Sequence, residues 1–99
     1  MIVVRNVFRL KFGMAKEAVA LLQEGIAIQK RAGADMNQRV MTDLVGTFYT
    51  LVLELTVPNM SALEANMPKV WGDKDWQAYY QKFSALVQSG YREIFTIVE

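Results

Sequence analysis

Two arginines and a glutamate are the residues of this sequence most able to do chemistry. Arg5 and Arg9 lie in an alternating segment near the start of the chain, and Glu54 lies inside a long apolar run. A guanidinium can hold a carboxylate or an enolate through paired hydrogen bonds, and a nearby glutamate can accept a proton. The same residues can instead form a structural ion-pair network that guards a sheet face against wrong pairing. Glu93 joins this set if the last strand turns its side chain the same way.

A second group of candidates is aromatic: Trp71 lies at a predicted helix break, and Trp76, Tyr79, Tyr80 and Phe83 lie along the helix that follows. This spacing is more typical of a core than of a ligand site, although the group could line an apolar pocket. We expect Trp71 and Tyr80 to lie outside the core, because Trp71 falls at a predicted helix break and a buried tyrosine hydroxyl needs a partner. The sequence leaves the catalytic residues unknown. The candidate ligand-pocket residues are Arg5, Arg9, Glu54, Trp71 and Tyr80.

The sequence contains no histidine and no cysteine, and this absence removes several kinds of site. It excludes a Ser–His pair, a thiol nucleophile, a disulfide and the ordinary zinc sites, all of which need one of these side chains. It also excludes haem ligation by imidazole or thiolate. The glycines are spread singly along the chain, so no phosphate-binding loop is present. We therefore expect a protein that uses no cofactor and no metal.

Size and composition predict one domain with a second apolar surface. The 99 residues form a single domain, 1–99, near the commonest domain size. Hydrophobic residues make up 53% of the chain, an excess that predicts a subunit interface. The net charge of +1 gives no reason to expect nucleic acid or an anionic membrane as a partner. Arg5 and Arg9 interrupt the apolar start of the chain, which argues against a signal peptide or membrane span and favours the cytoplasm.

The first half of the chain predicts strands on both sides of one helix. Residues 2–10 alternate with a period of two, as in a strand with one apolar and one mixed face. Residues 14–32 follow the helical period, and Gly33 ends that helix. Residues 38–57 predict two strands that meet at Gly46, of which the second, from position 48 on, is the most strongly strand-forming segment of the protein.

The second half predicts a broken helix and a final strand. The capping box from Ser61 to Glu64 opens a helix, which Pro68 to Gly72 interrupt. Asp73 can cap the last helical segment, and Ser89–Gly90 ends it. Residues 91–99 then form the fourth strand. The facing of that strand is ambiguous from its pattern alone.

This order of elements, βαββαβ, is the split βαβ arrangement and predicts an α+β fold. Right-handed crossovers place both helical segments on the same face of a four-stranded antiparallel sheet. The first and third strands then lie in the centre of the sheet, and we expect them to run parallel to each other. The helices leave the other face of the sheet uncovered.

The uncovered face predicts a homodimer. A single chain would expose its apolar residues as one patch, which usually marks an interface, and a second copy of the same face is the natural cover. Two sheets stacked in this way approximate a closed barrel. Arg5 and Arg9 share this face with a set of residues from the first three strands: Val3, Val7, Met41, Phe48, Thr50, Val52, Glu54 and Thr56.

Four segments carry a resemblance to a known family: Phe8–Gly13, Thr47–Glu54, Trp76–Phe83 and Gly90–Phe95. With them the chain resembles the dimeric α+β barrel superfamily, which has a ferredoxin-like fold and includes antibiotic-biosynthesis monooxygenases, haem-degrading enzymes and stress-responsive proteins. Within it the chain is most similar to NIPSNAP-like proteins. The resemblance implies a ferredoxin-like dimer. The haem-degrading branches rely on a histidine near the iron, and this sequence has none.

Three functional hypotheses remain from the sequence. The first is a small dimeric protein of unassigned activity that binds a small apolar or aromatic metabolite. The second is a cofactor-independent monooxygenase or isomerase, which needs only a shaped apolar cavity and a few polar groups that stabilise an enolate-like intermediate. The third is a partner-binding module without a small-molecule site. Fold does not decide among them, since one fold hosts many activities.

Overall fold

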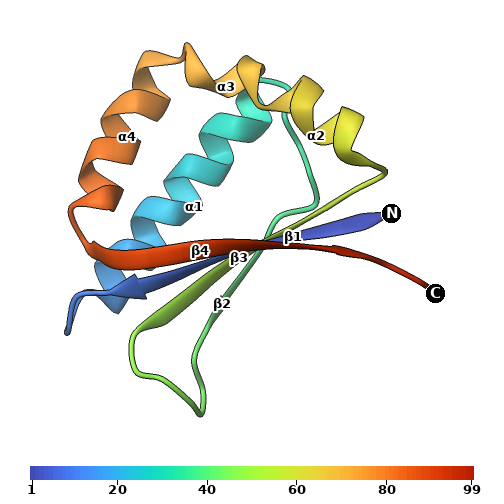
Figure 1. The fold of residues 1–99 in the computed structure, drawn as a ribbon. Coiled ribbons are helices and arrows are strands. Elements are labelled where there is room, and N and C mark those ends of the chain that lie inside the picture. Colours follow the sequence, from blue (N-terminus) through green and yellow to red (C-terminus); the bar gives the residue numbers. More distant parts are fainter.

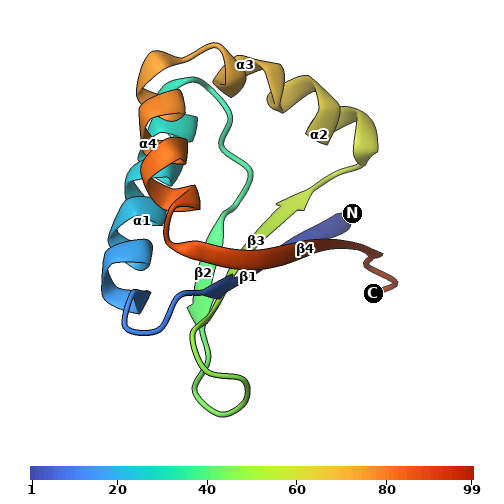
Figure 2. The same cartoon turned by 60° about the vertical axis from the view of Figure 1, so that its left-hand side comes forward.

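The computed structural model describes residues 1–99 as one four-stranded sheet with helices over a single face (Figure 1). The strand order is β2-β3-β1-β4, and each neighbouring pair is antiparallel. Figure 2 shows the same two layers from another side, with α1 and α4 side by side and α2–α3 arching away from the sheet. The elements are β1 (Ile2–Leu10), α1 (Ala15–Arg31), β2 (Arg39–Thr42), β3 (Thr50–Val57), α2 (Met60–Asn66), α3 (Pro68–Trp71), α4 (Lys74–Ser84) and β4 (Val87–Thr96).

The predicted α+β architecture is confirmed, with β1 and β3 in the centre of the sheet. The prediction that these two strands run parallel is wrong, because β1 pairs with β3 in the antiparallel sense. The connection through α1 returns the chain so that β2 runs in the direction of β1. The short β2–β3 connection then reverses it, and β3 runs against β1. A right-handed crossover followed by a hairpin therefore makes the whole sheet antiparallel.

The core lies between the sheet and the α1–α4 layer. Alternate residues of β1 and β3 point into it, as the period of two in both strands predicts. Every third or fourth residue of α1 and α4 meets them from the other side. The most buried members from these four elements are Val4, Leu10, Ala18, Leu22, Leu51, Leu55, Val57, Tyr79 and Phe83, and Ala34, Met36 and Val70 from the neighbouring segments are equally buried.

Helix α1 forms where the helical period predicts it, within a residue at each end. Its buried stripe includes Leu22, Gly25, Ile28 and Gln29, and the cations of its last turn suit the negative end of the helix dipole. The helix is 17 residues long. None of the helices combines the length and the apolarity that crossing a bilayer would require.

The start of α2 differs from the sequence prediction. Asn59 is the N-cap, and its side-chain oxygen accepts a hydrogen bond from the Ala62 N–H at 2.9 Å. The capping box from Ser61 to Glu64 is therefore wrong, because the helix begins two residues earlier and Ser61 lies inside its first turn. Asparagine is as strong an N-cap as serine, so the upstream residue, directly after Pro58, takes the role.

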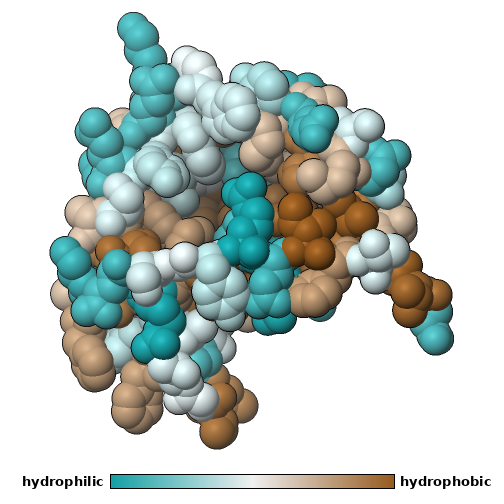
Figure 3. Space-filling view, in the orientation of Figure 1, coloured by the Kyte–Doolittle hydropathy of each residue, from teal (hydrophilic) through white to brown (hydrophobic).

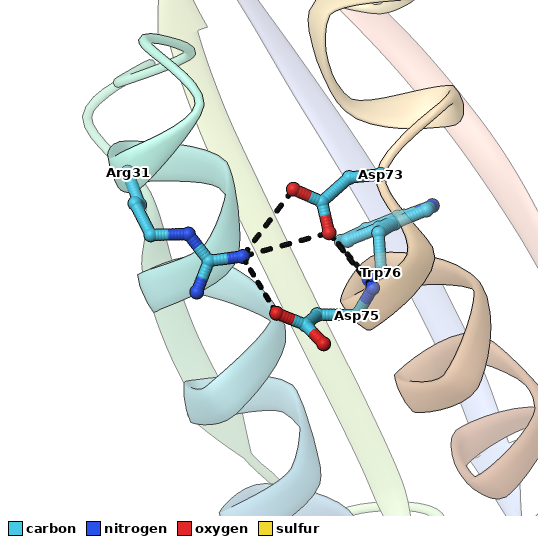
Figure 4. A network of polar contacts seen from close by, with 4 residues as sticks. All are labelled: Arg31, Asp73, Asp75 and Trp76. Atoms are coloured by element: carbon cyan, nitrogen blue, oxygen red, sulfur yellow. Dashed lines mark hydrogen bonds and ion pairs between the residues drawn. The ribbon is translucent and has the colours of Figure 1, made fainter.

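Helix α4 begins at Asp73, as predicted, and is tied there to the end of α1. The Asp73 carboxylate accepts hydrogen bonds from the Asp75 and Trp76 N–H groups at 2.8 and 3.1 Å. The Arg31 guanidinium, from the last turn of α1, lies 3.3 Å from Asp73 and 3.1 Å from Asp75 (Figure 4). This network joins the positive end of α4 to the negative end of α1, where both charges are favourable.

Strand β3 is shorter at its start than its sequence predicts. Residues 48 and 49 belong to the connection, because Tyr49 has a φ of 58° and cannot continue an extended strand. The Asp43 side chain accepts from the Thr50 N–H at 2.9 Å and closes the loop between β2 and β3. Local turn chemistry therefore overrides the strand propensity of Phe48 and Tyr49.

Strand β4 begins at Val87, before its predicted start at residue 91, and ends at Thr96, before its predicted end at residue 99. Ser89 and Gly90, expected to end the preceding helix, pair with Arg9 and Phe8 inside the sheet. A Cβ at position 90 would lie 3.0 Å from the Val7 carbonyl oxygen and 3.3 Å from the Phe8 ring. Gly90 therefore marks a close approach between strands rather than a helix end. The last three residues, 97–99, lie outside the strand.

Candidate functional site

A cavity of about 410 Å³ lies between the sheet and the helices. Strands β1, β3 and β4 form one wall, and α1, α4 and the α2–α3 junction form the other. Figure 3 shows the surface hollowed between the helices and β4, with apolar side chains gathered beside it. Ten of its thirteen lining residues are hydrophobic, and its volume lies in the range of small-molecule sites.

The break in the second helical region opens this cavity. Pro68 is the first residue of α3, where its missing N–H costs nothing, but α2 cannot continue through it as one straight helix. The chain turns again at Gly72 before Asp73 starts α4. Because of these two turns, α2 and α3 arch over the sheet instead of lying flat on it (Figure 2). Met67 and Trp71, at the break, line the cavity.

The aromatic side chains divide between core and rim. Tyr79 and Phe83 are buried, and their rings stack at a centroid distance of 5.7 Å. Trp71 is 61% exposed and Tyr80 is 56% exposed, yet both line the cavity, so they stand at its rim. Burial, and then the nearby Tyr80 and Glu24, raises the pKa of Tyr79 well above the usual range of a phenol. Tyr79 is therefore a neutral hydroxyl at any physiological pH.

Asn6 and Arg92 form a polar pair on the sheet wall. They are cross-strand partners on β1 and β4, and Arg92 Nε donates to Asn6 Oδ1 at 2.7 Å. Asn6 is buried, whereas Arg92 reaches the surface. Both line the cavity. A guanidinium held at the edge of an apolar space can bind an anionic or carbonyl oxygen.

Gln29 is the polar residue of the helix wall. It is 5% exposed, and its side-chain oxygen accepts a hydrogen bond from Gln38 Nε2 at 2.8 Å. The same Gln38 nitrogen donates to the Ala34 carbonyl oxygen at 3.2 Å. The segment that follows α1 thus folds back over its last turn and fixes the Gln29 side chain at the cavity.

Arg5, Arg9 and Glu54 lie on the opposite face of the sheet, here called the open face. The register puts four charged residues in one row across the strands, in the order Arg39, Glu54, Arg5 and Glu93. Arg5 Nε lies 3.7 Å from Glu54 Oε2, and Arg39 hydrogen-bonds the other carboxylate oxygen. Because Glu93 is the cross-strand partner of Arg5, its side chain lies on the open face. This pairing settles which residues of β4 face the helices and which do not.

Two arginine nitrogens on the open face lack a hydrogen-bond partner. Arg5 Nε and Arg9 Nε are buried, and neither has an acceptor within hydrogen-bond distance. The stems of these arginines flank Val7, which is buried together with Val52 within the single chain. The expectation that Val7 and Val52 would be exposed in a single chain is therefore wrong, because long arginine stems can cover apolar surface.

Residues other than Val7 and Val52 supply the exposed apolar surface of the open face. Tyr91 and Phe95 of β4 are the cross-strand partners of Val7 and Val3, and both are exposed. Phe48, which the sequence placed in a strand on this face, is exposed in the β2–β3 connection.

The five residues predicted to line a pocket thus form two separate groups. Trp71 and Tyr80 line the cavity, whereas Arg5, Arg9 and Glu54 lie across the sheet from it. No group of three or more carboxylates or other metal-ligating side chains comes together anywhere in the chain.

Sequence reasoning missed the three polar residues of the cavity. Asn6 is a polar residue at an apolar position of the β1 alternation, and Gln29 lies within the apolar stripe of α1, so both carried a signal. Arg92 carried none, because its facing depends on the register of β4.

Comparison with solved structures shows the fold that the sequence resemblance predicted. The chain is similar to an uncharacterised NIPSNAP domain protein from Burkholderia xenovorans, with a TM-score of 0.87 and 19% identity over 99% of this chain and 95% of that one. It is similar to a NIPSNAP family protein from Agrobacterium tumefaciens, with a TM-score of 0.87 and 22% identity over 99% and 93% of the two chains. SnoaB from Streptomyces nogalater, a cofactor-independent oxygenase, matches with a TM-score of 0.74 and 12% identity over 99% and 93%.

These likenesses establish a shared ferredoxin-like fold, and the predicted resemblance is confirmed at that level. No protein-family model matches the chain, and a comparison with curated proteins finds no significant match.

Proposed function

We propose that the cavity between the helices and the sheet binds a small apolar or aromatic metabolite. The observation that carries this proposal is the cavity itself, about 410 Å³ with mostly hydrophobic lining. Side chains fill most of the space between packed elements, so an apolar hollow of this volume that stays open beneath the helices is a candidate binding site. Polar groups at only a few points, from Asn6, Gln29 and Arg92, suit a site that orients an apolar ligand.

A fluorescent probe tests this proposal directly. The probe 1-anilinonaphthalene-8-sulfonate should bind saturably, at one molecule per chain, with its emission shifted to the blue. Trp71→Ala should weaken binding several-fold, because Trp71 stands at the rim of the cavity. Phe12→Ala is the matched control, since Phe12 is a similarly exposed aromatic residue that does not line the cavity. Non-saturable binding, or equal losses in both variants, would rule out this site.

We also propose that the protein is a homodimer formed through the open face. Buried Arg9 Nε has no acceptor within its own chain, and the Glu93 carboxylate has no ion-pair partner. Buried donors are rarely left unpaired, so we infer that Arg9 Nε finds its acceptor on a second chain. Exposed Tyr91 and Phe95 would supply apolar contacts beside this pair. We propose that Arg9 of one copy pairs with Glu93 of the other.

A cofactor-independent monooxygenase or isomerase is the second candidate. The observation that favours it is the Asn6–Arg92 pair, since such a pair beside aromatic rings could stabilise the oxyanion of an enolate-like intermediate. The likeness to SnoaB and to an antibiotic biosynthesis monooxygenase is a likeness of fold and adds an analogy only. Oxygen uptake with a phenolic or anthrone-type substrate would support the enzyme. Retention of a metabolite without turnover would support the binding protein.

Native mass spectrometry of the purified protein distinguishes the binding protein and the enzyme from the third hypothesis, a partner-binding module without a small-molecule site. A bound small molecule supports a binding or catalytic site, and we expect one per chain. A chain that carries none and binds no probe would favour a partner-binding module. We keep the cytoplasm as the proposed compartment for all three.

A further inference from the structure

The amide groups of the cavity have an orientation that their neighbours impose. The Ala34 carbonyl oxygen can only accept, so the Gln38 atom 3.2 Å from it is the amide nitrogen. That nitrogen lies 2.8 Å from the Gln29 side chain, so the Gln29 atom facing it is the oxygen. The Met36 N–H, 3.4 Å from the other Gln38 atom, agrees with this assignment. Gln29 is therefore left with its NH₂ group free.

The free NH₂ group of Gln29 has no acceptor in the protein. Gln29 is 5% exposed and lines the cavity, so the cavity is the space in which an acceptor could lie. The buried side-chain atoms without a partner are Arg5 Nε and Arg9 Nε, so the Gln29 nitrogen is open to the cavity, where water or a ligand can accept from it. Two further contacts hold Gln38 in place, which prevents the Gln29 amide from turning over to offer its oxygen instead.

The polar side chains on the sheet wall of the cavity also leave donor groups free. Arg92 Nε is always a donor, so the Asn6 atom at 2.7 Å is the oxygen, and the Asn6 NH₂ group is left free. The terminal nitrogens of Arg92 are donors as well. No carboxylate lines the cavity. Both walls therefore present N–H groups to the ligand, and the oxygen of each amide already accepts one hydrogen bond within the protein. The hydroxyls of Tyr79 and Tyr80, which also line the cavity, can donate as well as accept.

We propose that the cavity selects an aromatic keto acid or a closely related molecule, with acceptor oxygens at two places on an apolar body. A carbonyl oxygen accepts from Gln29, and a carboxylate or enolate oxygen faces Asn6 and Arg92. Gln29 is thus a specificity-determining residue, and Gln38 is the residue that positions it. This inference rests on the proposed small-molecule binding and adds the chemical class of the ligand.

Two probes that differ in one atom position test the Gln29 contact. The first is 6-acetyl-2-naphthoate, which carries a carboxylate and a ketone. The second is 6-isopropenyl-2-naphthoate, in which a CH₂ group replaces the ketone oxygen with almost the same shape. Isothermal titration calorimetry on the full chain gives the ratio of their dissociation constants. We expect the ketone to bind about five- to tenfold more tightly, the net effect of one hydrogen bond.

Variants test whether the preference for the ketone probe comes from the Gln29 amide that Gln38 holds in place. Gln29→Leu should abolish the preference while leaving the isopropenyl probe bound, and Gln29→Glu should reverse it, since a carboxylate repels the ketone oxygen. Gln38→Leu should reduce it, because the Gln29 amide is then free to rotate. Gln23→Leu, an exposed glutamine on the same helix, is the control and should keep it. Gln38→Leu also serves if Gln29→Leu fails to fold.

The outcomes separate this inference from the proposed function. Equal affinities for the two probes in the wild-type protein, or a preference that persists in Gln29→Leu, would overturn the acceptor assignment while leaving small-molecule binding intact. Loss of both naphthoates while 1-anilinonaphthalene-8-sulfonate still binds would also overturn it. If no probe binds, the proposed binding function fails as well.

Discussion

Arg5 and Glu54 are cross-strand partners on β1 and β3, and Arg5 Nε lies 3.7 Å from Glu54 Oε2 on the open face. Arg39 approaches the same carboxylate from β2, so Glu54 lies between two guanidinium groups. Within one chain the Arg5 side chain is 39% exposed and that of Glu54 is 13% exposed. Surface pairs of this kind are coupled by only about 0.2–1 kcal/mol, because solvent screens them. A second copy on the open face would bury the pair and strengthen the coupling.

The coupling between Arg5 and Glu54 is therefore our first prediction. A double-mutant cycle with Arg5→Met and Glu54→Met, measured by thermal or denaturant unfolding, should give a coupling energy above about 1 kcal/mol. In a dimer that buries the pair, Glu54→Gln alone should cost about 3–5 kcal/mol, because it leaves buried cations without a counter-ion. The double Met variant should recover much of that loss. Coupling below about 0.5 kcal/mol, the scatter of independent sites, would contradict the structural role.

The second prediction is that the protein is a dimer in solution. Light scattering on a size-exclusion column should return twice the chain mass of 11.3 kDa at micromolar concentration. Val52→Lys, in the middle of the open face, should dissociate or unfold the dimer, because it places a charge at a position that is already buried within the single chain and lies in the proposed interface. Lys16→Glu on α1 is the control and should leave the dimer intact. A stable monomer of the wild-type chain would refute the proposed interface.

Charge exchange tests the proposed Arg9–Glu93 contact within that dimer. Arg9→Glu and Glu93→Arg should each weaken self-association, since each puts two like charges together. A chain that carries both changes should dimerise again. If the double variant is as weak as either single one, the two residues do not meet across the interface.

The sequence predicted most of the fold because its strongest signals are local. The alternation of β1 placed Arg5 and Arg9 on the open face, and Asp73 was identified as a cap from its position alone. The errors fall where tertiary contacts decide. Ser89 and Gly90 look like a helix end but are held in β4 by pairing with β1. Tyr49 has high strand propensity but adopts a left-handed conformation that ends the strand.

The candidate site was predicted only in part, for the same reason. Trp71 and Tyr80 could be placed beside a cavity from the helix break and the aromatic spacing. Asn6 and Arg92 are 86 positions apart, and only the β1–β4 register brings them together. A shift of one residue would turn Arg92 to the open face. Register between strands distant in sequence is set by the packed sheet and not by local pattern.

The third prediction concerns haem. Since the chain has no histidine and no cysteine, titration with haem should give no saturable shift of the Soret band. Metal analysis of the purified protein should find no stoichiometric transition metal. A tight complex of one haem per chain would contradict the ligand argument and would require methionine or tyrosine as the axial ligand.

The fourth prediction is a pH dependence at the start of α4. The hydrogen bond from the Trp76 N–H, with those from Arg31 and Asp75, lowers the pKa of Asp73 below its ordinary value. A carboxyl whose pKa is lower in the folded state adds stability above its unfolded pKa of about 3.9 and loses it as the pH falls through the folded value. The melting temperature of Asp73→Ala should therefore lie below that of the wild type at pH 7, and the gap should narrow below about pH 4.

Asp73→Asn separates the charge of this residue from its hydrogen bonds. Asparagine caps a helix about as well as aspartate, so this variant should lose less than Asp73→Ala at pH 7. Its remaining difference from the wild type should vanish at low pH, where Asp73 is protonated. A difference between Asp73→Asn and wild type that grows as the pH falls would have the wrong sign for a lowered pKa.

The fifth prediction follows from the contact between Gly25 of α1 and Tyr79 of α4. Replacing glycine by alanine in a helix normally stabilises it by about 1 kcal/mol. At position 25, however, the added Cβ would lie 2.5–2.8 Å from three atoms of the Tyr79 ring. Tyr79 is buried and stacked on Phe83, so its ring has little freedom to move except toward the cavity that it lines. We expect Gly25→Ala to lower the free energy of unfolding by about 1–3 kcal/mol, the usual cost of overpacking.

Gly72→Ala is the matched control for this substitution. Position 72 has a φ of −85°, which alanine adopts readily, and no atom lies within 4 Å of an added Cβ. The control should be neutral or stabilising by about 0.4–1 kcal/mol, because alanine restricts the unfolded chain. Denaturant unfolding measures both variants, and probe titration should show weaker binding in Gly25→Ala alone, since the displaced Tyr79 ring narrows the cavity. If Gly25→Ala is as stable as Gly72→Ala and binds the probe normally, then α1 and α4 are not packed as closely at this point as the 2.5 Å approach to Tyr79 requires.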